Sequence, residues 1–488
     1  MGEKQTTTIG QRSSLLARPS AWVSVTPLPV ARRGVVSTAG IAVQGLVRFC
    51  YSLLIGRTMP AGFLSATNSA ISTSMLSTLL WPTSLASAAG KFLARESGSP
   101  QRAAALTRYL GRLCVLTSVA LAAVAVVVTA VWLAPGHPST AVFVGLLTLG
   151  WSGYTFVRSA HYATNRVARA TFWDLLSFLV SVLGLVLVLA FDATDLLLLP
   201  ITVGYLGYAV LGWPRGTKGA LDEALKREMR RYVSWGVVGS LTTGGFLQLT
   251  MVMAHQTGDT TGADAYAAAL TLATPASMIG SVLSLLLLPT LSEAVGRGDL
   301  DSVRRQTDLA SRGLIALVGG VFGVVIVGSR VVVAVIWPNL TSTVPILEVL
   351  LLATFLMTAA AACTESINSF SVHGARTMGV IRSIGFVTGL AVVGALVSGM
   401  SVLGIAIGYL AGMVLTGLIP IAVVWRRDGQ RWGPSALRVL VGAALAAGLV
   451  VLRDRWGPVG WHDLLLVAVF ALAWLAMLGR DTRVLLRR

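Results

Sequence analysis

Long unbroken runs of apolar residues constrain this chain more than any other feature of its sequence. A helix that crosses a bilayer needs about 20 predominantly apolar residues. Strands of a membrane β-barrel would instead alternate apolar and polar residues. The sequence therefore predicts an all-α polytopic membrane protein with about 14 transmembrane helices, at residues 35–56, 62–87, 110–133, 141–160, 173–191, 195–213, 232–255, 265–290, 313–337, 344–367, 379–399, 402–424, 436–452 and 462–479.

The composition excludes several other classes of protein. Hydrophobic residues make up 55% of the chain and charged residues 12%, whereas soluble domains are about 25% charged. So little polar surface cannot coat a water-soluble fold, which excludes a soluble multidomain enzyme. A disordered chain and a disulfide scaffold are excluded as well. The net charge of +18 comes from short clusters of Lys and Arg between the apolar runs. Such clusters are topology signals, so we expect no nucleic-acid partner.

The distribution of basic residues predicts the orientation in the membrane. Placing the N-terminus in the cytoplasm puts 33 basic residues on the cytoplasmic side and 4 on the other side, with Arg48 inside the membrane. Positive residues favour the cytoplasmic side. We therefore expect an inner-membrane protein with an even number of spans and both termini in the cytoplasm.

Two polar segments outside the apolar runs predict structure of a different kind. Residues 1–33 are polar, basic and rich in Ser and Thr, which is typical of a disordered cytoplasmic tail. In residues 218–232, Leu221, Leu225 and Met229 recur at helical spacing among charged residues. This pattern predicts an amphipathic helix on the inner membrane surface, within a linker at 214–231.

The chain repeats itself at a spacing of about 204 residues. Gly204-Tyr205-Leu206 recurs as Gly408-Tyr409-Leu410, and Thr38, Gly40 and Gln44 recur at the same spacing as Thr242, Gly244 and Gln248. Six spans separate the copies, so both copies start on the same side of the membrane. The sequence therefore predicts a parallel repeat of two six-helix lobes, 34–213 and 232–425, followed by two extra helices and a basic tail at 426–488.

The arrangement and two stretches of sequence resemble a known family. Gly262-Ala-Asp-Ala-Tyr266 precedes Pro275 in the eighth span, and Leu288-Pro-Thr-Leu-Ser-Glu-Ala-Val-Gly-Arg297 opens the loop after it. Together with the six-plus-six plan and two added helices, these stretches resemble the multidrug/oligosaccharidyl-lipid/polysaccharide (MOP) exporter superfamily, and its polysaccharide-flippase branch in particular. The resemblance covers roughly residues 31–430 and implies a cleft lined by spans 1, 2, 7 and 8.

Arg48 is the deepest charge in the membrane. It lies about 12 Å from the end of the first span, at 1.5 Å per residue, and an Arg at a helix centre costs about 2.5–3.5 kcal/mol on insertion. Arg48 either bonds structurally to a neighbouring helix or faces the cleft as a phosphate-binding cation. Its repeat partner is Val252, so this charge belongs to one lobe only.

Polar side chains around Arg48 are the other candidate ligands for a sugar head group. They crowd the second span and recur in the spans that the resemblance places in the cleft. An alternative interpretation is helix packing through small polar residues. The candidate substrate-binding residues are Arg48, Gln44, Asn68, Ser69, Ser72, Thr73, Thr242, Gln248, Thr271 and Thr274.

Carboxylates and sequence motifs limit the possible energy sources. Drug antiporters of the resembled superfamily commonly use an acid in the first spans, and this chain has none between Lys4 and Arg95. Glu365 in the tenth span is the candidate for binding a coupling ion, or it pairs with Arg382. No phosphate-binding loop, metal-ligand spacing or nucleophile motif occurs. We therefore expect no cofactor, no metal and no enzymatic activity.

The favoured function is an alternating-access flippase. Its substrate would be a polyprenyl-pyrophosphate-linked oligosaccharide used for cell-surface polysaccharide, and its partners would be membrane lipids and glycan polymerase or glycosyltransferases. A peptidoglycan-precursor flippase is a close variant, although family members with that role look richer in cleft arginines. Two alternatives stay open: a cation-coupled antiporter for a small amphipathic compound, and a non-transporting scaffold for glycan assembly.

Overall fold

The computed structural model describes residues 30–96, 98–217, 219–370 and 372–485. The first half of the chain, here called the N-terminal half, contains α1 (Val30–Thr58), α2 (Phe63–Leu80), α3 (Pro82–Arg95), α4 (Pro100–Val128), the π-helical turn η1 (Thr129–Leu133), α5 (Pro138–Ala163), α6 (Val167–Ala190), the 3-10 turn η2 (Thr194–Leu196) and α7 (Leu199–Gly212).

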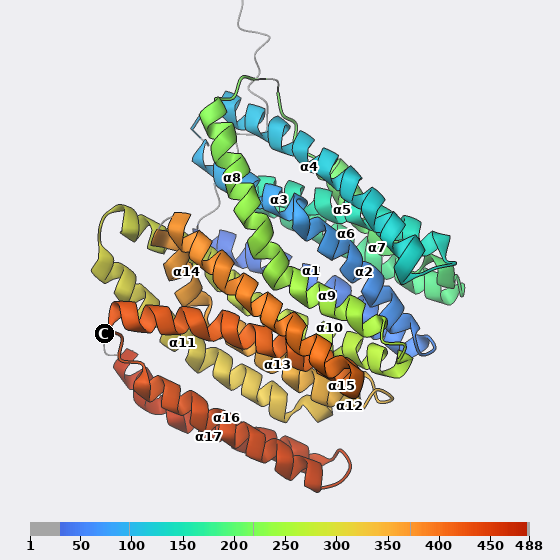
Figure 1. Cartoon of the computed structure of the whole chain (residues 1–488), viewed down its shortest axis with the longest axis vertical. Coiled ribbons are helices and arrows are strands. Elements are labelled where there is room, and N and C mark those ends of the chain that lie inside the picture. Colours follow the sequence, from blue (N-terminus) through green and yellow to red (C-terminus); the bar gives the residue numbers. More distant parts are fainter. Residues whose placement is uncertain (1–29, 97, 218, 371, 486–488) are drawn as a thin grey trace, which may run out of the picture.

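The second half of the chain is also helical. The C-terminal half contains α8 (Glu223–Ser240), the π-helical turn η3 (Leu241–Gly245), α9 (Phe246–His255), α10 (Thr260–Gly296), α11 (Leu300–Val327), α12 (Ser329–Ile336), α13 (Thr343–Ala359), α14 (Ala361–Phe370) and α15 (Val372–Asp428). The C-terminal hairpin consists of α16 (Gly433–Arg455) and α17 (Trp461–Leu485). Figure 1 shows the two halves side by side, with the hairpin beyond α11.

The expected apolar runs coincide with helices throughout the described part of the chain. Ten helices there are long and apolar enough to cross a membrane, so the chain is an all-α multi-pass membrane protein. The expected second span is divided between α2 and α3, because Pro82 starts a new helix after Trp81. The expected eleventh and twelfth spans lie together in α15, with Ser401 at φ 48° and ψ −130° between them.

The structure differs from the sequence-based expectation at the end of the predicted N-terminal tail and at the predicted amphipathic helix. The predicted tail at 1–33 lies outside the described residues as far as residue 29, and residues 30–33 already belong to α1. The amphipathic stretch predicted as a separate surface helix instead forms the first turns of α8. From residue 223 the chain stays helical through η3 to residue 255. The charged turns are therefore a continuation of the seventh span and not an independent element.

The repeated Gly-Tyr-Leu motif has the same packing role in both halves. A Cβ atom at Gly204 of α7 would lie 2.9 Å from the Ser177 carbonyl oxygen of α6, and one at Gly408 would lie 2.8 Å from the Val393 amide nitrogen. Only glycine permits these close approaches of neighbouring backbones. Tyr205 and Tyr409, which follow the glycines, are both buried. The repeat therefore preserves a close backbone contact in both halves, between α6 and α7 in the N-terminal half and between the two segments of α15 on either side of Ser401 in the C-terminal half.

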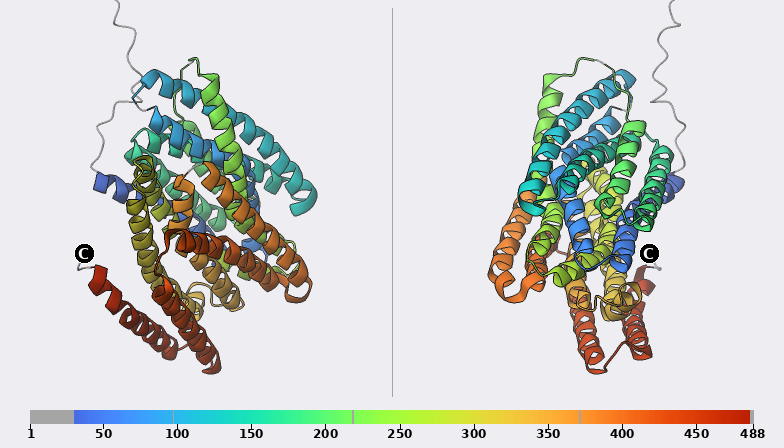
Figure 2. Two further views of the ribbon diagram at one scale, coloured as in Figure 1. Left: turned by 60° about the vertical axis from the view of Figure 1, so that its left-hand side comes forward. Right: turned by 90° about the vertical axis from the view of Figure 1, so that its right-hand side faces the viewer.

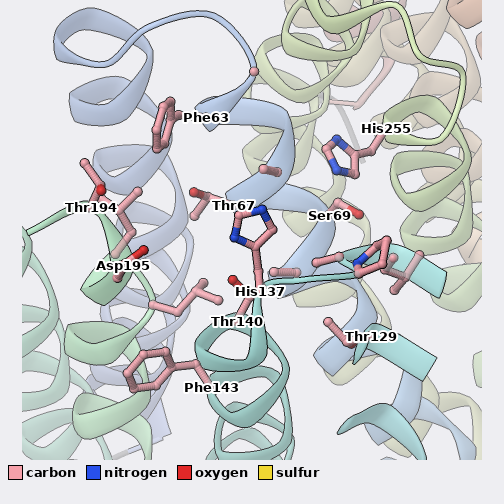
Figure 3. Close-up of a pocket in the computed structure, with 18 of the residues that line it drawn as sticks. Phe63, Thr67, Ser69, Thr129, His137, Thr140, Phe143, Thr194, Asp195 and His255 are labelled. Atoms are coloured by element: carbon pink, nitrogen blue, oxygen red, sulfur yellow. The ribbon is translucent and has the colours of Figure 1, made fainter. Parts of the chain in front are cut away.

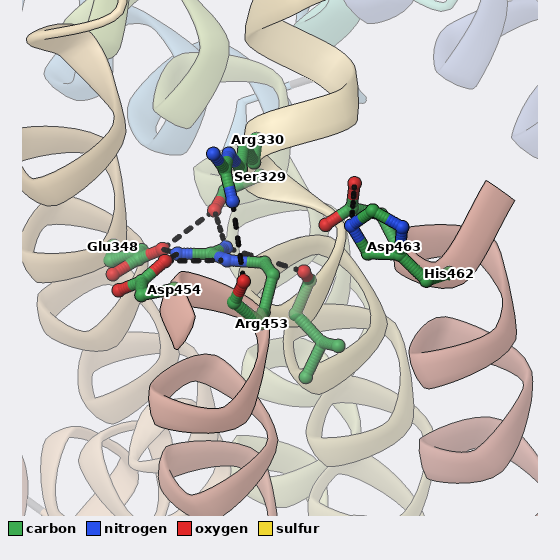
Figure 4. A network of polar contacts seen from close by, with 8 residues as sticks. Ser329, Arg330, Glu348, Arg453, Asp454, His462 and Asp463 are labelled. Atoms are coloured by element: carbon green, nitrogen blue, oxygen red, sulfur yellow. Dashed lines mark hydrogen bonds and ion pairs between the residues drawn. The ribbon is translucent and has the colours of Figure 1, made fainter. Parts of the chain in front are cut away.

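A buried arginine connects the C-terminal hairpin to the C-terminal half (Figure 4). The Arg453 side chain at the end of α16 is 1% exposed, and its Nη2 lies 3.0 Å from Glu348 Oε1 of α13. Its Nη1 donates to Ser329 Oγ at 3.0 Å and to the Val327 carbonyl oxygen at 3.3 Å. Along its length the hairpin packs on α11 through Phe470 and Trp474. Both views in Figure 2 show the hairpin at the edge of the molecule.

Replacing Arg453 is expected to destabilise the attachment of the hairpin. In Arg453→Leu the Glu348 carboxylate loses its cation in a poorly hydrated place, which costs about 3 kcal/mol. We expect a lower midpoint of thermal unfolding in detergent and faster proteolysis of the 428–433 connection. Arg455→Leu, at an exposed position of the same helix, is the control. Equal midpoints for the two variants would contradict the anchoring role.

Candidate functional site

Arg48 lies at the centre of a buried polar network between the two halves. Its side chain on α1 is almost completely buried. Nη2 donates to Ser72 Oγ at 2.9 Å and Nε donates to Asn68 Oδ1 at 3.3 Å, both on α2. Nη1 donates to Gln248 Oε1 on α9 at 3.1 Å. The guanidinium therefore joins the N-terminal half to the C-terminal half.

The network continues to α10 through a serine that sequence reasoning missed. Asn68 Nδ2 donates to Ser52 Oγ at 3.0 Å, and Thr271 Oγ1 donates to the same oxygen at 2.8 Å. Ser52 lies one helical turn after Arg48 on α1, and that spacing could have revealed it. The structure thus brings five of the predicted residues into one network that runs through Arg48 and Ser52, namely Arg48, Asn68, Ser72, Gln248 and Thr271.

The charge of Arg48 is met by neutral groups. Its hydrogen-bond partners are a hydroxyl and two amide oxygens, with Met75 Sδ at 3.6 Å. No carboxylate in the described part of the chain lies within ion-pair distance of it. The network can therefore hold the guanidinium while leaving its positive charge available to an anion.

The other predicted hydroxyls are used mainly within their own helices. Thr73 Oγ1 donates to the Ser69 carbonyl oxygen, Thr242 Oγ1 to that of Val238, and Thr274 Oγ1 to that of Leu270. Such bonds satisfy a hydroxyl inside a membrane helix without a ligand. Ser69 itself lines a cavity on another face of α2.

Gln44 belongs to a second polar cluster inside the N-terminal half and not to the Arg48 network. Its Oε1 accepts a hydrogen bond from Arg158 Nη1 of α5 at 3.4 Å. Arg158 Nε also lies 3.3 Å from Asp174 Oδ2 of α6, and Tyr154 donates to the other oxygen of that carboxylate at 3.1 Å. The Asp174 side chain is 1% exposed. Asp174 is thus a buried carboxylate inside the N-terminal half, paired with Arg158.

Glu365 is nearly buried on α14. Its Oε2 accepts a long hydrogen bond of 3.5 Å from Asn368 Nδ2, and Arg382 on α15 interacts with it electrostatically. Within the described residues, no group of three or more His, Cys, Asp or Glu side chains is arranged to hold a metal ion. Both roles expected of Glu365, binding a coupling ion and pairing with Arg382, stay predictions.

A second contact between the halves lies where α1 ends and α2 begins. Asp264 of α10 accepts hydrogen bonds from the backbone amides of Gly62 at 2.6 Å and Ser65 at 2.7 Å. Gly62 has φ 96°, a left-handed conformation that favours glycine. The carboxylate thus caps the N-terminus of α2 from the opposite half, where the helix dipole favours a negative charge. Asp264 belongs to the Gly262–Tyr266 stretch, for which sequence reasoning gave no role.

Arg57 adds to this closure. Its Nε and Nη2 donate to the carbonyl oxygens of Ile336 and Val335 at 2.8 and 2.5 Å. Both acceptors lie in the last turn of α12, in the C-terminal half. The halves are therefore joined at this end of the bundle as well as around Arg48.

Solved structures that resemble this one identify the fold. A lipid II flippase, MurJ, in an inward closed conformation matches with a TM-score of 0.66 and 11% identity, covering 92% of this chain and 99% of that one. An inward-facing multidrug resistance MATE family transporter of the MOP superfamily matches with a TM-score of 0.61 and 12% identity, covering 80% and 98%. The chain has the fold of MOP superfamily transporters.

A third match is a MOP superfamily transporter from Pyrococcus furiosus, with a TM-score of 0.60 and 12% identity over 82% of this chain and 95% of that one. No protein-family model and no curated protein sequence matches the chain. Because the identities are so low, these likenesses show the fold alone. They confirm the expected superfamily architecture and leave the branch and the substrate as proposals.

The Asp264 cap gives a testable prediction about the contact between the halves. In Asp264→Asn the amide presents one acceptor oxygen where the carboxylate presented two, and it removes the negative charge at the helix end, which costs about 1–2 kcal/mol. We expect a single cysteine at position 61, in a background without Cys50, Cys114 and Cys363, to react faster with a polar maleimide.

Asp259→Asn is the matched control, because Asp259 caps Gly262 within its own half. An unchanged labelling rate in Asp264→Asn would show that this carboxylate does not hold the halves together.

Proposed function

We propose that this protein is a flippase that moves a polyprenyl-pyrophosphate-linked oligosaccharide across a bacterial inner membrane by alternating access. The observation that carries the proposal is the buried Arg48 guanidinium, which is shared by both halves and surrounded by neutral acceptors. Arg is suited to phosphate because its planar fork offers two parallel donors and stays charged.

The geometry suggests how a phosphate would compete for Arg48. Hydrogen bonds to charged groups are worth about 1.5–3 kcal/mol, and those with a charged acceptor are stronger than those with an amide oxygen. A phosphate oxygen would therefore displace Gln248 Oε1 from Nη1. Because this bond connects α1 to α9, its loss would weaken the contact between the halves at the same moment as the cargo binds.

The remaining parts of the proposal follow from the chemistry of such a cargo. The hydroxyls of Ser52, Ser72 and Thr271 offer hydrogen bonds to the head group, while the apolar tail stays in lipid. The contacts around Asp264 would close the end that the charge bias assigns to the outside. Glycan polymerase or glycosyltransferases would be the functional partners, since they produce or consume the same lipid-linked glycan.

Removing the charge of Arg48 is expected to reduce transport. Arg48→Gln keeps a hydrogen-bonding side chain but gives up the charge-assisted bonds, so we expect flipping of a fluorescent polyprenyl-pyrophosphate oligosaccharide in proteoliposomes to fall by about 10- to 100-fold. Mass spectrometry should detect the lipid-linked glycan on the purified wild type and not on the variant. Arg455→Gln removes an exposed arginine of the C-terminal hairpin, outside both halves, and is the matched control. Wild-type transport by Arg48→Gln would refute the proposed role.

A second substitution tests the same site by adding an anion that competes with phosphate for Arg48. Gln248→Glu is isosteric and provides Arg48 with a permanent anionic partner from the other half. We expect this variant to lose flipping while its thermal unfolding midpoint stays equal to that of the wild type or rises, because the ion pair holds the halves together and excludes phosphate. Retained transport would argue against phosphate binding at Arg48.

A cation-coupled antiporter is the second candidate, because the fold is shared with a MATE family transporter and Glu365 is nearly buried. This candidate expects a proton or sodium gradient to drive efflux and Glu365→Gln to abolish it. The flippase proposal expects no such efflux. Both assays on one set of variants separate the two functions.

A further inference from the structure

A cavity of about 640 Å³ lies in the N-terminal half, near the point where α2 begins (Figure 3). It is formed by α2, η1, the start of α5 and the segment around η2, and His255 at the end of α9 also lines it. Its volume falls within the range of about 300–1,000 Å³ that is usual for small-molecule sites.

The cavity and the Arg48 network lie on different faces of α2. Thr67 and Ser69 line the cavity, whereas Asn68 and Ser72, one turn apart, bond to Arg48. One polar helix thus separates two sites of different chemistry. One site would not require so many hydroxyl residues in α2. Two sites, one on each face of the helix, explain why they are so numerous.

The lining of the cavity combines polar groups with a larger apolar surface, and it carries no Lys or Arg side chain. Hydroxyl groups come from all four elements, and two aromatic rings, Phe63 and Phe143, provide apolar surfaces. The hydroxyl-bearing residues are Thr67, Ser69, Thr129, Thr140 and Thr194. A neutral sugar has the matching chemistry, because its ring presents both hydroxyls and an apolar face, whereas phosphate would lack a cation here.

Thr129 provides an independent observation that points to a ligand. It is 2% exposed, and its Oγ1 has no hydrogen-bond partner within the described part of the chain. Buried hydroxyls are nearly always bonded, so an orphaned one needs an explanation. Thr129 also opens the π-helical turn η1, in which its carbonyl accepts from the Ala134 amide. Such turns occur frequently at functional sites.

We propose that this cavity is a binding site for a neutral sugar unit, separate from the Arg48 phosphate site. The sugar is either part of the lipid-linked cargo or a free oligosaccharide. Binding of the cargo's glycan here rests on the proposed flippase function, whereas binding of a free oligosaccharide does not. His137, His255 and Asp195 would add hydrogen bonds from the rim.

Saturation-transfer NMR on the full-length protein in nanodiscs tests the site directly. The probe is an equimolar mixture of maltotriose, raffinose and chitotriose. We expect saturation transfer to at least one sugar, reduced at least five-fold in Thr129→Val, which removes only the unpartnered hydroxyl. Because that hydroxyl has no partner, the variant should unfold at the wild-type temperature or above it.

Two control variants keep the result interpretable. Thr148→Val on α5 removes a buried hydroxyl that donates to the Val144 carbonyl oxygen, and Arg48→Gln alters the phosphate site. Both should keep the sugar signal. No transfer to any of the three sugars, or equal transfer in Thr129→Val and the wild type, would overturn the proposal.

Proteoliposome flipping distinguishes the two sources of the sugar. If the cargo's glycan binds here, Thr129→Val should slow flipping of a polyprenyl-pyrophosphate tetrasaccharide at least five-fold more than flipping of the corresponding monosaccharide, and Arg48→Gln should slow both equally. If wild-type protein flips neither lipid but still binds the soluble sugars, the flippase proposal fails and the sugar site stands with a free oligosaccharide as its ligand.

Discussion

The buried charge of Arg48 is the constraint on which the centre of this protein depends. A guanidinium within a membrane helix costs about 2.5–3.5 kcal/mol, and only a matched set of acceptors makes it tolerable. Here the acceptors are neutral and come from α2 and α9, on either side of the boundary between the halves. The positions of these helices are therefore fixed relative to α1 by hydrogen bonds, in a region where the surrounding lipid offers none.

The two halves are joined at two depths by different chemistry. Around Arg48, long flexible side chains reach across the boundary, whereas at the start of α2 the Asp264 carboxylate bonds to backbone amides of the opposite half. A ligand can replace one side chain in the contact around Arg48. The backbone amides at the start of α2, in contrast, have only water as an alternative partner when the Asp264 carboxylate leaves. The contact around Arg48 is thus suited to binding cargo, and the Asp264 cap is suited to controlling the opening of that end of the bundle.

Much of the fold could be predicted from the sequence, because helix-length apolar runs and a repeat spacing are one-dimensional signals. Arg48, Asn68, Ser72, Gln248 and Thr271 were predicted as a group, since deep polar residues in a membrane must find one another. Single-sequence reasoning missed contacts that depend on helix rotation and on long-range pairing. It therefore assigned Gln44 to Arg48 instead of Arg158, and gave Ser52 and Asp264 no role.

The same limit applies to the places where helices break or continue. Pro82 could have shown the division of the second span, since proline favours the first turn of a new helix. The continuation of the charged turns of α8 into a 33-residue helix had no such signal. Charged residues there indicated a membrane surface, whereas in the structure they form the end of a spanning helix that packs beside α3, with Arg95 paired to Glu228.

The attachment of the C-terminal hairpin has a mechanical consequence. Its contacts, through Arg453 and through the packing of Phe470 and Trp474 on α11, are all with the C-terminal half. That half therefore presents a longer perimeter to the viscous lipid than the N-terminal half does. In the alternating-access cycle proposed above, friction would be greater on the larger body. The N-terminal half, which carries both Arg48 and the cavity lined by α2 and η1, would then make the larger excursion.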